Sequence, residues 1–367
     1  MAIPLFDTEA QLREVRADVD AALARVVESG RFILGPEVEA FERELAEYLG
    51  VRNVVGVANG TDALTISLTA LGIGPGDDVL VPSFTFYASA EAIPHTGARP
   101  VFCDVDPRTF CITPETVAAA LTPATRAVIA VHLFGRVAAV DQLRELLGER
   151  GIAIVEDSAQ AAGAMLGGRR AGSLGDVATF SFFPSKNLFC LGDGGAIATD
   201  DDRLAERARM LRFHGSRDKV EYEAVGWNSR LDALQAAVLR AILPRLDGWN
   251  ERRRDLAAAY VESGIEEFAA PPVARVGEQP VHHLFVTRSA EPDALAARLG
   301  AAGIASRSYY RAPVHRQPAM AAWAPADGLP GTDEAARTNL ALPMGPTLGR
   351  AAAAVTDALR GRSRQGE

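Results

Sequence analysis

The stretch Ser181-Phe-Phe-Pro-Ser-Lys-Asn187 decides the fold, because it joins a β-forming aromatic run to a glycine-rich turn, Gly192-Asp-Gly-Gly195. Pro184 stops the strand, and the glycines allow a tight return that leaves Lys186 at a strand end facing a cavity. Upstream, the strand-like run Gly151-Ile-Ala-Ile-Val-Glu-Asp157 ends in an acid. We therefore predict that Lys186 and Asp157 lie at the ends of neighbouring strands.

This pair predicts a particular chemistry. A desolvated lysine can form a Schiff base, and an acid can hold a pyridinium nitrogen; together they are the minimal protein apparatus around pyridoxal phosphate. The ordinary alternatives are a solvated surface lysine and a strand-ending or helix-capping aspartate. The joint occurrence of Lys186 and Asp157 favours an enzyme over both.

The composition predicts a globular protein with a large core. The chain has 367 residues, of which 48% are hydrophobic and 23% charged, so we expect two domains. Its net charge of −9 argues against a nucleic-acid partner. Cys103, Cys111 and Cys190 have the spacing of neither a disulfide framework nor a metal site, so we expect reduced thiols and no metal. Without a charged leader or a long apolar run, we expect a cytoplasmic protein with no membrane partner.

Strands and helices alternate after two opening amphipathic helices. The apolar runs predict strands over residues 53–58, 78–81, 100–105, 127–133, 152–157, 179–183 and 196–199. Helical patterns lie between them at 61–71, 114–121 and 140–150. This alternation predicts the α/β class, with a mostly parallel sheet covered by helices on both faces.

The pattern changes after residue 230. Two helical stretches, 231–246 and 251–263, precede the proline-rich run 269–273. Beyond it we expect a strand at 282–288, a helix at 292–302, a strand at 306–310 and a last helix at 350–360. The predicted domains are therefore a large one over 1–247 and a smaller C-terminal α/β one over 248–367.

Two further strand ends offer groups that suit a phosphate and an aromatic ring. Gly60-Thr61 opens a helix, where unpaired amides attract a phosphate and glycine allows its close approach. Phe86 follows the next strand and offers a ring for stacking. A plain capped helix and a core aromatic are the alternatives. Ligands of open α/β sheets gather at the carboxyl ends of strands, so we expect one shared crevice.

Six ordered motifs extend over nearly the whole chain. They are 58–64 (Ala-Asn-Gly-Thr-Asp-Ala-Leu), 82–86 (Pro-Ser-Phe-Thr-Phe), 131–135 (Val-His-Leu-Phe-Gly), 155–160 (Val-Glu-Asp-Ser-Ala-Gln), 181–188 with 192–195, and 226–237 (Gly-Trp-Asn-Ser-Arg-Leu-Asp-Ala-Leu-Gln-Ala-Ala). With these motifs the sequence resembles the DegT/DnrJ/EryC1/StrS sugar aminotransferases, of the fold-type I pyridoxal-phosphate class.

The resemblance implies a role for each matching residue. Lys186 would carry the cofactor and shuttle the proton, Asp157 would pair with the pyridinium nitrogen, and Gln160 would bond the ring hydroxyl. Phe86 would stack on the ring. The phosphate would be bound by Gly60, Thr61, Ser181 and, from the neighbouring subunit of a homodimer with shared active sites, Asn228.

The resemblance also implies the reaction. An amino group would pass from glutamate, leaving 2-oxoglutarate, through the pyridoxamine phosphate form to a nucleotide-linked ketosugar. Phe183 in the lysine motif favours a 3-keto-deoxysugar over a 4-keto one. A keto-inositol aminotransferase is the nearest alternative. A sugar dehydratase is disfavoured, because those relatives replace the lysine with histidine, and a non-enzymatic regulator is disfavoured by the acidic charge and the lack of a DNA-reading module.

The residues that choose the substrate are less clearly marked. In relatives, the segment that contains Tyr309, Tyr310, Arg311 and His315 lines the sugar site, and another such segment contains His282 and His283. Each is more often a packed or surface residue than a ligand. Arg136 and Trp227 stand where the family usually has glutamine and tyrosine, and these departures bear on the substrate more than on the reaction.

Overall fold

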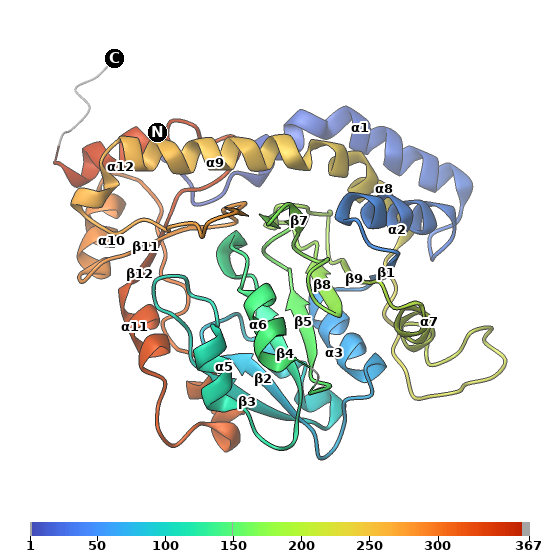
Figure 1. Ribbon diagram of the computed structural model, residues 1–367. Coiled ribbons are helices and arrows are strands. Elements are labelled where there is room, and N and C mark those ends of the chain that lie inside the picture. Colours follow the sequence, from blue (N-terminus) through green and yellow to red (C-terminus); the bar gives the residue numbers. More distant parts are fainter. Residues whose placement is uncertain (1, 149, 362–367) are drawn as a thin grey trace.

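The computed structural model describes residues 2–148 and 150–361, and its centre is a seven-stranded sheet (Figure 1). Its strand order is β1-β9-β8-β5-β4-β2-β3. All neighbouring pairs are parallel except those that β9 makes with β1 and β8. The bounds are β1 Asn53–Val57, β2 Asp78–Pro82, β3 Arg99–Cys103, β4 Thr125–Val131, β5 Ala153–Asp157, β8 Val177–Ser181 and β9 Gly195–Thr199. The predicted mostly parallel sheet is confirmed.

Helices cover the sheet because its strands are apolar on both faces. Strands β2 and β9 are buried throughout, as expected of strands between two helical layers. The helices of the central part are α3 Gly60–Ala70, α4 Ala88–Glu91, α5 Pro114–Ala120, α6 Val140–Leu147 and α7 Asp202–Leu211. The side chain of Asn59 accepts a hydrogen bond from the Asp62 amide and so caps α3 at the predicted strand-to-helix turn.

A second core lies on the β1 side of the sheet, under the amino-terminal helices (Figure 1). Helices α1 (Thr8–Ser29) and α2 (Pro36–Leu49) pack there against α8 (Ala233–Ile242). Phe41 lies edge-on to Phe182, with ring centroids 5.5 Å apart. The aromatic run that begins the lysine motif is thus anchored in this core.

The carboxyl-terminal part forms a smaller layer beneath the long helix α9 (Leu246–Glu262; Figure 1). Strands β11 (Phe285–Arg288) and β12 (Asn339–Leu342) pair antiparallel there, and Tyr260 of α9 stacks on Phe285 at 4.6 Å. The other elements of this part are α10 Pro292–Ala301, α11 Pro330–Thr338 and α12 Ala351–Leu359. Three short strands form a separate sheet: β6 Met165–Leu166, β7 Arg169–Arg170 and β10 Glu278–Gln279.

The predicted strand at 306–310 is wrong. Only Arg307 pairs there, as an isolated bridge to Ala341, and the chain turns at Tyr309 and Tyr310. The partner of β11 is β12, whose apolar sequence Asn-Leu-Ala-Leu is fully buried. Aromatic residues raise β propensity, but here they belong to a turn whose rings pack on the central part.

We propose the domain division near residue 247 from the packing. A separate core joins α9, β11, α10, β12 and α12. Ile3 also packs against this core and bridges to Ile304, so the first residues cross to the smaller part. Among the described residues, no helix combines the length and the apolar character needed to cross a membrane.

One buried carboxylate ties three segments of the central part together. Glu156 on β5 accepts hydrogen bonds from His132 Nε2 at 2.7 Å and from the amides of Gly172, Leu174 and Gly175 at 2.8, 2.7 and 2.6 Å. His132 Nδ1 in turn accepts from the amide of Ala138, which places the ring proton on Nε2. Although burial opposes the charge, these donors lower the pKa of Glu156.

Replacing this carboxylate is expected to weaken the fold. In Glu156→Gln the new amide N–H₂ would face a backbone N–H group, so we expect a loss of about 3 kcal/mol in the free energy of unfolding. Because the folded pKa lies below the unfolded one, the contribution of Glu156 is present above about pH 4.3 and is lost as the pH falls below it.

Urea unfolding followed by circular dichroism between pH 3.5 and 7 measures this loss. The exposed Glu145→Gln serves as the matched control, which we expect to change stability by less than about 0.5 kcal/mol. Equal stability of the two variants at pH 7 would contradict the role given to Glu156.

Candidate active site

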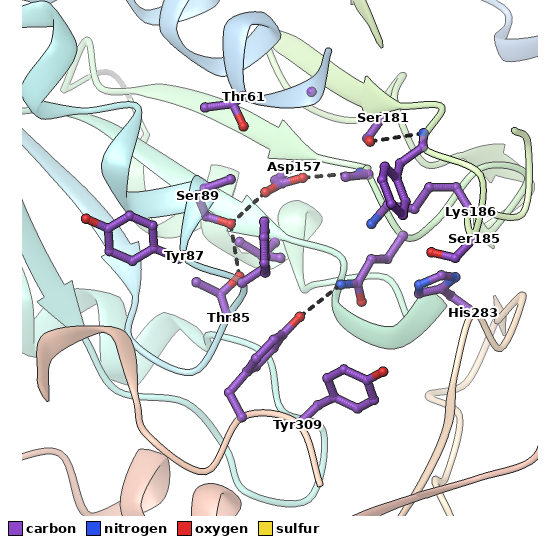
Figure 2. A pocket seen from close by; sticks show the side chains of 18 of the residues that line it. Thr61, Thr85, Tyr87, Ser89, Asp157, Ser181, Ser185, Lys186, His283 and Tyr309 are labelled. Carbon is purple, nitrogen blue, oxygen red and sulfur yellow. Dashed lines mark hydrogen bonds between the residues drawn. The ribbon is translucent and has the colours of Figure 1, made fainter. Parts of the chain in front are cut away.

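A single cavity of about 1150 Å³ opens at the carboxyl ends of the parallel strands. Strand β8 contributes Ser181 and β5 contributes Asp157 (Figure 2). The turn after β2 contributes Phe86. Parallel strands end at the same edge of a sheet, so residues distant in sequence converge there. The predicted residues that line the cavity are Gly60, Thr61, Phe86, Asp157, Gln160, Ser181, Lys186, Tyr309 and Tyr310.

Lys186 lies in the turn that follows β8. Its backbone amide donates to the carbonyl of Phe183 at 2.8 Å, which closes the turn predicted from Pro184 and the glycines. Burial lowers the pKa of Lys186 to about 8, and the Asp157 carboxylate opposes this shift. An amine with this pKa is partly neutral near pH 7.5 and can therefore act as a nucleophile or a base.

Asp157 is held by a chain of hydroxyl groups. Ser89 Oγ donates to Asp157 Oδ2 at 2.7 Å, and the amide of Ala159 donates to Oδ1 at 3.2 Å. Since Ser89 has only one hydroxyl proton, Thr85 must donate the hydrogen bond of 2.9 Å that joins the two hydroxyls. Ser89 and Thr85 were not predicted, because serine and threonine after a strand carry no distinct sequence signal.

Gln160 connects the cavity floor to two aromatic residues. Its Oε1 accepts from the amide of Phe134 at 2.7 Å, and its Nε2 donates to the Tyr310 hydroxyl at 3.3 Å. Tyr310 stacks on Phe134, and burial raises its pKa, so its phenol stays protonated. Phe86, with 55% of its surface exposed, lies 6.3 Å from the Tyr310 ring and leaves one face to the cavity.

The start of α3 provides a close approach to the backbone. A Cβ on Gly60 would lie 2.8 Å from Ser181 Cβ, so only glycine fits between the helix start and the end of β8. Thr61 follows at the second position of the helix, where amides lack intrahelical partners. This glycine, the two hydroxyls of Thr61 and Ser181, and the helix end form a donor set for a phosphate.

These residues fit pyridoxal phosphate on geometric grounds. A phosphate cradle, a partly neutral buried lysine, a hydroxyl-held carboxylate and a free aromatic face surround one space (Figure 2). Two observations support this fit. Only glycine can occupy position 60 beside Ser181, and burial lowers the pKa of Lys186.

Some predicted residues lie elsewhere. His315 is buried outside the lining, where its Nδ1 contacts Ser83 Oγ at 2.6 Å. Asn228 is exposed and does not line the cavity of its own chain. Arg311 lines the cavity but is ion-paired to Asp293. His283 lines the cavity, whereas its neighbour His282 does not.

The two departures from the family pattern also lie outside the cavity lining. Arg136 makes a buried ion pair with Glu278 at 2.8 Å. This pair ties the loop after β4 to β10, so the contacts of Arg136 are structural ones. Trp227 packs at the edge of the main core.

Comparison with known proteins agrees with this geometry. A "dTDP-3-amino-3,4,6-trideoxy-alpha-D-glucose transaminase" from Streptomyces venezuelae is 49% identical over 362 residues, 98% of this chain and 95% of the relative. A "pleiotropic regulatory protein" from Geobacillus stearothermophilus is 42% identical, over 95% of both chains. The crystal structure of S. venezuelae DesV in complex with a ketimine intermediate superposes with a TM-score of 0.95, at 48% identity over the whole of both chains.

The family's own sequence model gives the same result. The model of the DegT/DnrJ/EryC1/StrS aminotransferase family matches residues 13–360. The fold-type I class and the aminotransferase activity predicted from the motifs are confirmed by these matches. The chain belongs to the DegT/DnrJ/EryC1/StrS aminotransferase family.

Proposed function

We propose that this enzyme uses pyridoxal phosphate to move an amino group from glutamate to a nucleotide-linked 3-keto-deoxysugar, making an amino sugar. The observation that carries the proposal is the buried amine of Lys186 opposite the Asp157 carboxylate in one cavity. The S. venezuelae relative, whose name specifies a 3-amino sugar, supports the position of the new nitrogen.

The residues that would hold the cofactor follow from the site. Gly60, Thr61 and Ser181 would bind its phosphate, Phe86 would cover one ring face, and Gln160 would bond its ring hydroxyl. When bound, pyridoxal phosphate supplies an electron sink that stabilises negative charge on the substrate carbon. Asp157, oriented by Ser89, would keep the ring nitrogen protonated.

Lys186 would move the proton between substrate and cofactor. With a pKa of about 8, its amine is available as a base near neutral pH without a separate activating group. The Asp157 carboxylate favours the ammonium form that results from proton uptake. The pair therefore lets one residue accept a proton in one step and return it in the next.

The size and lining of the cavity support a large substrate. A volume of about 1150 Å³ exceeds that of the usual small-molecule pocket. Tyr309 and Tyr310 line it, and Arg307 adds a cationic group at its edge. Phe183, the residue that favours a 3-keto sugar in the lysine motif, also lines it and is 52% exposed.

Two alternatives keep the same site. A keto-inositol aminotransferase would use the same lysine chemistry on a substrate without a nucleotide. A regulator is suggested by the name of the G. stearothermophilus relative, but a regulator needs no partly neutral lysine beside a held carboxylate. A visible absorbance band that shifts on addition of glutamate supports the enzyme, and a chain without such a band supports the regulator.

We further propose a homodimer in which Asn228 reaches the phosphate site of the partner. Asn228 is exposed just before α8, at a position suited to contact with another chain. Apolar side chains are exposed beside the start of α8, at Phe32, Ile33 and Leu191, whose backbones contact Ala233, Asp232 and Gln235. Burial of these groups against a second copy would remove them from water.

Lys186→Ala is expected to abolish transamination, by about 10⁴-fold or more, with the fold retained, because the residue lines a cavity instead of filling a core. Borohydride reduction gives the sharpest measurement, since the chain contains only two lysines, Lys186 and Lys219. Peptide mapping should place the reduced cofactor on Lys186. Cofactor on Lys219, or full activity of Lys186→Ala, would overturn the assignment.

The product should carry its new nitrogen on C3. We expect turnover of a nucleotide-linked 3-keto-deoxysugar and mapping of the amine to C3 by NMR, because Phe183 and the named 3-amino relative both favour that position. A 4-keto sugar and a keto-inositol serve as comparison substrates. Nitrogen on C4, or turnover of the inositol alone, would contradict the substrate assignment.

Lys186→Ala and Asn228→Ala subunits should restore each other's activity. Re-paired heterodimers would contain one site with both lesions and one with neither, so about half of the wild-type activity per heterodimer is expected, as one of its two sites is intact. Unmixed variants are the controls. Heterodimers as inactive as Lys186→Ala, or an active monomer by light scattering, would rule out the shared site.

A further inference from the structure

His283 is a buried histidine on the cavity wall to which none of the steps above assigns a role. It is 5% exposed, lines the cavity, and lies on the same side of it as Ser185 and Lys186 (Figure 2). Its backbone is clamped against the loop after β4. The amide of Val281 donates to the Gly135 carbonyl at 2.9 Å, and a Cβ on Gly135 would lie 2.6 Å from His283 N. The backbone from which the ring projects is therefore fixed.

A chain of two buried asparagines determines which ring nitrogen of His283 carries the proton. Asn250 Nδ2 donates to the carbonyl of Ala162 at 3.0 Å, so Asn250 Oδ1 must be the acceptor toward Asn187. Asn187 Nδ2 donates to Asn250 Oδ1 at 2.8 Å and to the carbonyl of Val281 at 3.1 Å. Carbonyl groups only accept, so neither amide can be turned round without losing a hydrogen bond.

The remaining Asn187 oxygen faces the histidine. Asn187 Oδ1 lies 3.2 Å from His283 Nδ1, and an amide oxygen accepts but never donates. The proton must therefore be on Nδ1. His283 Nε2 has no hydrogen-bond partner among the described residues. It is also not one of the fully buried polar atoms, so it is accessible from the cavity that the ring lines.

The charges around the ring keep it from taking a second proton. Burial and the cationic groups of Lys186 and Arg253 hold the pKa of His283 well below its usual range. Arg253 is itself buried: its Nη1 donates to the carbonyl of His282 at 3.3 Å, and its Nε has no hydrogen-bond partner in the described part of the chain. The imidazole is thus neutral, with a lone pair on Nε2.

We propose that His283 Nε2 is a specificity-determining acceptor that receives a hydrogen bond from a hydroxyl or amide N–H on a carbon next to the substrate's carbonyl carbon. The proposal rests on the proposed function, because it concerns a ketosugar. The reacting carbon must approach Lys186, and His283 lines the same side of the cavity (Figure 2), so the group that meets Nε2 is one attached beside the reacting carbon.

The chemistry of the acceptor limits what it selects. A lone pair that faces the cavity needs a donor, and a substrate without one leaves Nε2 unpaired once it displaces water. A ketosugar with a hydroxyl flanking its ketone supplies this donor, whereas the corresponding deoxy sugar does not. The glutamate half-reaction involves no such hydroxyl, so it should not depend on His283.

The proton position is tested without substrate by NMR of the protein labelled with ¹⁵N in its histidine rings. His283→Gln identifies the signals of His283 by their loss. We expect a protonated Nδ1 and an unprotonated Nε2 at pH 7.5, and an inverted pattern in which Nε2 carries the proton would overturn the proposal. His282→Gln, which changes the adjacent buried histidine outside the cavity lining, is the matched control.

The selectivity is tested with two nucleotide-linked ketosugars that differ only by the flanking hydroxyl. We expect wild type to prefer the hydroxylated sugar by about 10- to 100-fold in kcat/KM. His283→Leu should reduce this ratio to near one. His283→Gln, whose side-chain oxygen can replace Nε2, should keep part of the ratio, and His282→Gln should keep all of it.

Each outcome decides between the two proposals. If His283→Leu keeps the wild-type ratio, or slows the glutamate half-reaction as much as the sugar half-reaction, the proposed role of His283 is wrong. Either result leaves the proposed aminotransferase function in place. Turnover of neither ketosugar by the wild-type enzyme overturns the proposed function and the role of His283 with it. If His283→Leu does not fold, as judged by circular dichroism, the ratio in His283→Gln and the NMR pattern of wild type decide.

Discussion

The site depends on the placement of Glu156 and Asp157, two adjacent buried carboxylates at the end of β5. Successive side chains of a strand point to opposite faces, so the two residues serve different parts of the molecule. Glu156 points away from the cavity and gathers His132 with three backbone amides. Asp157 points into the cavity toward Ser89. The position of β5 in the sheet, which is held by the hydrogen bonds of Glu156, therefore also fixes Asp157 in the cavity.

Electrostatics divide the cavity into two halves. Asp157 is the negative group on the β5 side, where it accepts hydrogen bonds from the Ser89 hydroxyl and the Ala159 amide. On the other side, Lys186 and the buried Arg253 lie near the neutral His283. Burial lowers the pKa of Arg253 to about 10. Burial is the main cause that keeps the imidazole of His283 neutral, and the positive charges of Lys186 and Arg253 add to it.

Much of the fold, and the convergence of Gly60, Asp157 and Lys186 on one cavity, could be predicted from the sequence, because their signals are local. Continuous apolar runs mark β4 and β5, and Pro184 with the glycines after it indicates the turn that places Lys186. The cavity wall around His283 and Tyr310 could not be predicted, because it depends on packing between distant segments. His315 turned out to contact Ser83, and the tautomer of His283 depends on Asn187 and on Asn250 of α9.

The smaller carboxyl-terminal part packs beside the cavity and also contributes residues to its wall. Tyr310 receives a hydrogen bond from Gln160, which is itself held by Phe134 of the loop after β4. The same loop clamps the backbone of residues 281–284 through Phe134 and Gly135. One loop of the central sheet therefore positions both segments of the smaller part that line the cavity. A change in how the two parts pack would move Tyr310 and His283 together while leaving Lys186 and Asp157 in place, so under the proposed function substrate choice would vary while the lysine chemistry stayed constant.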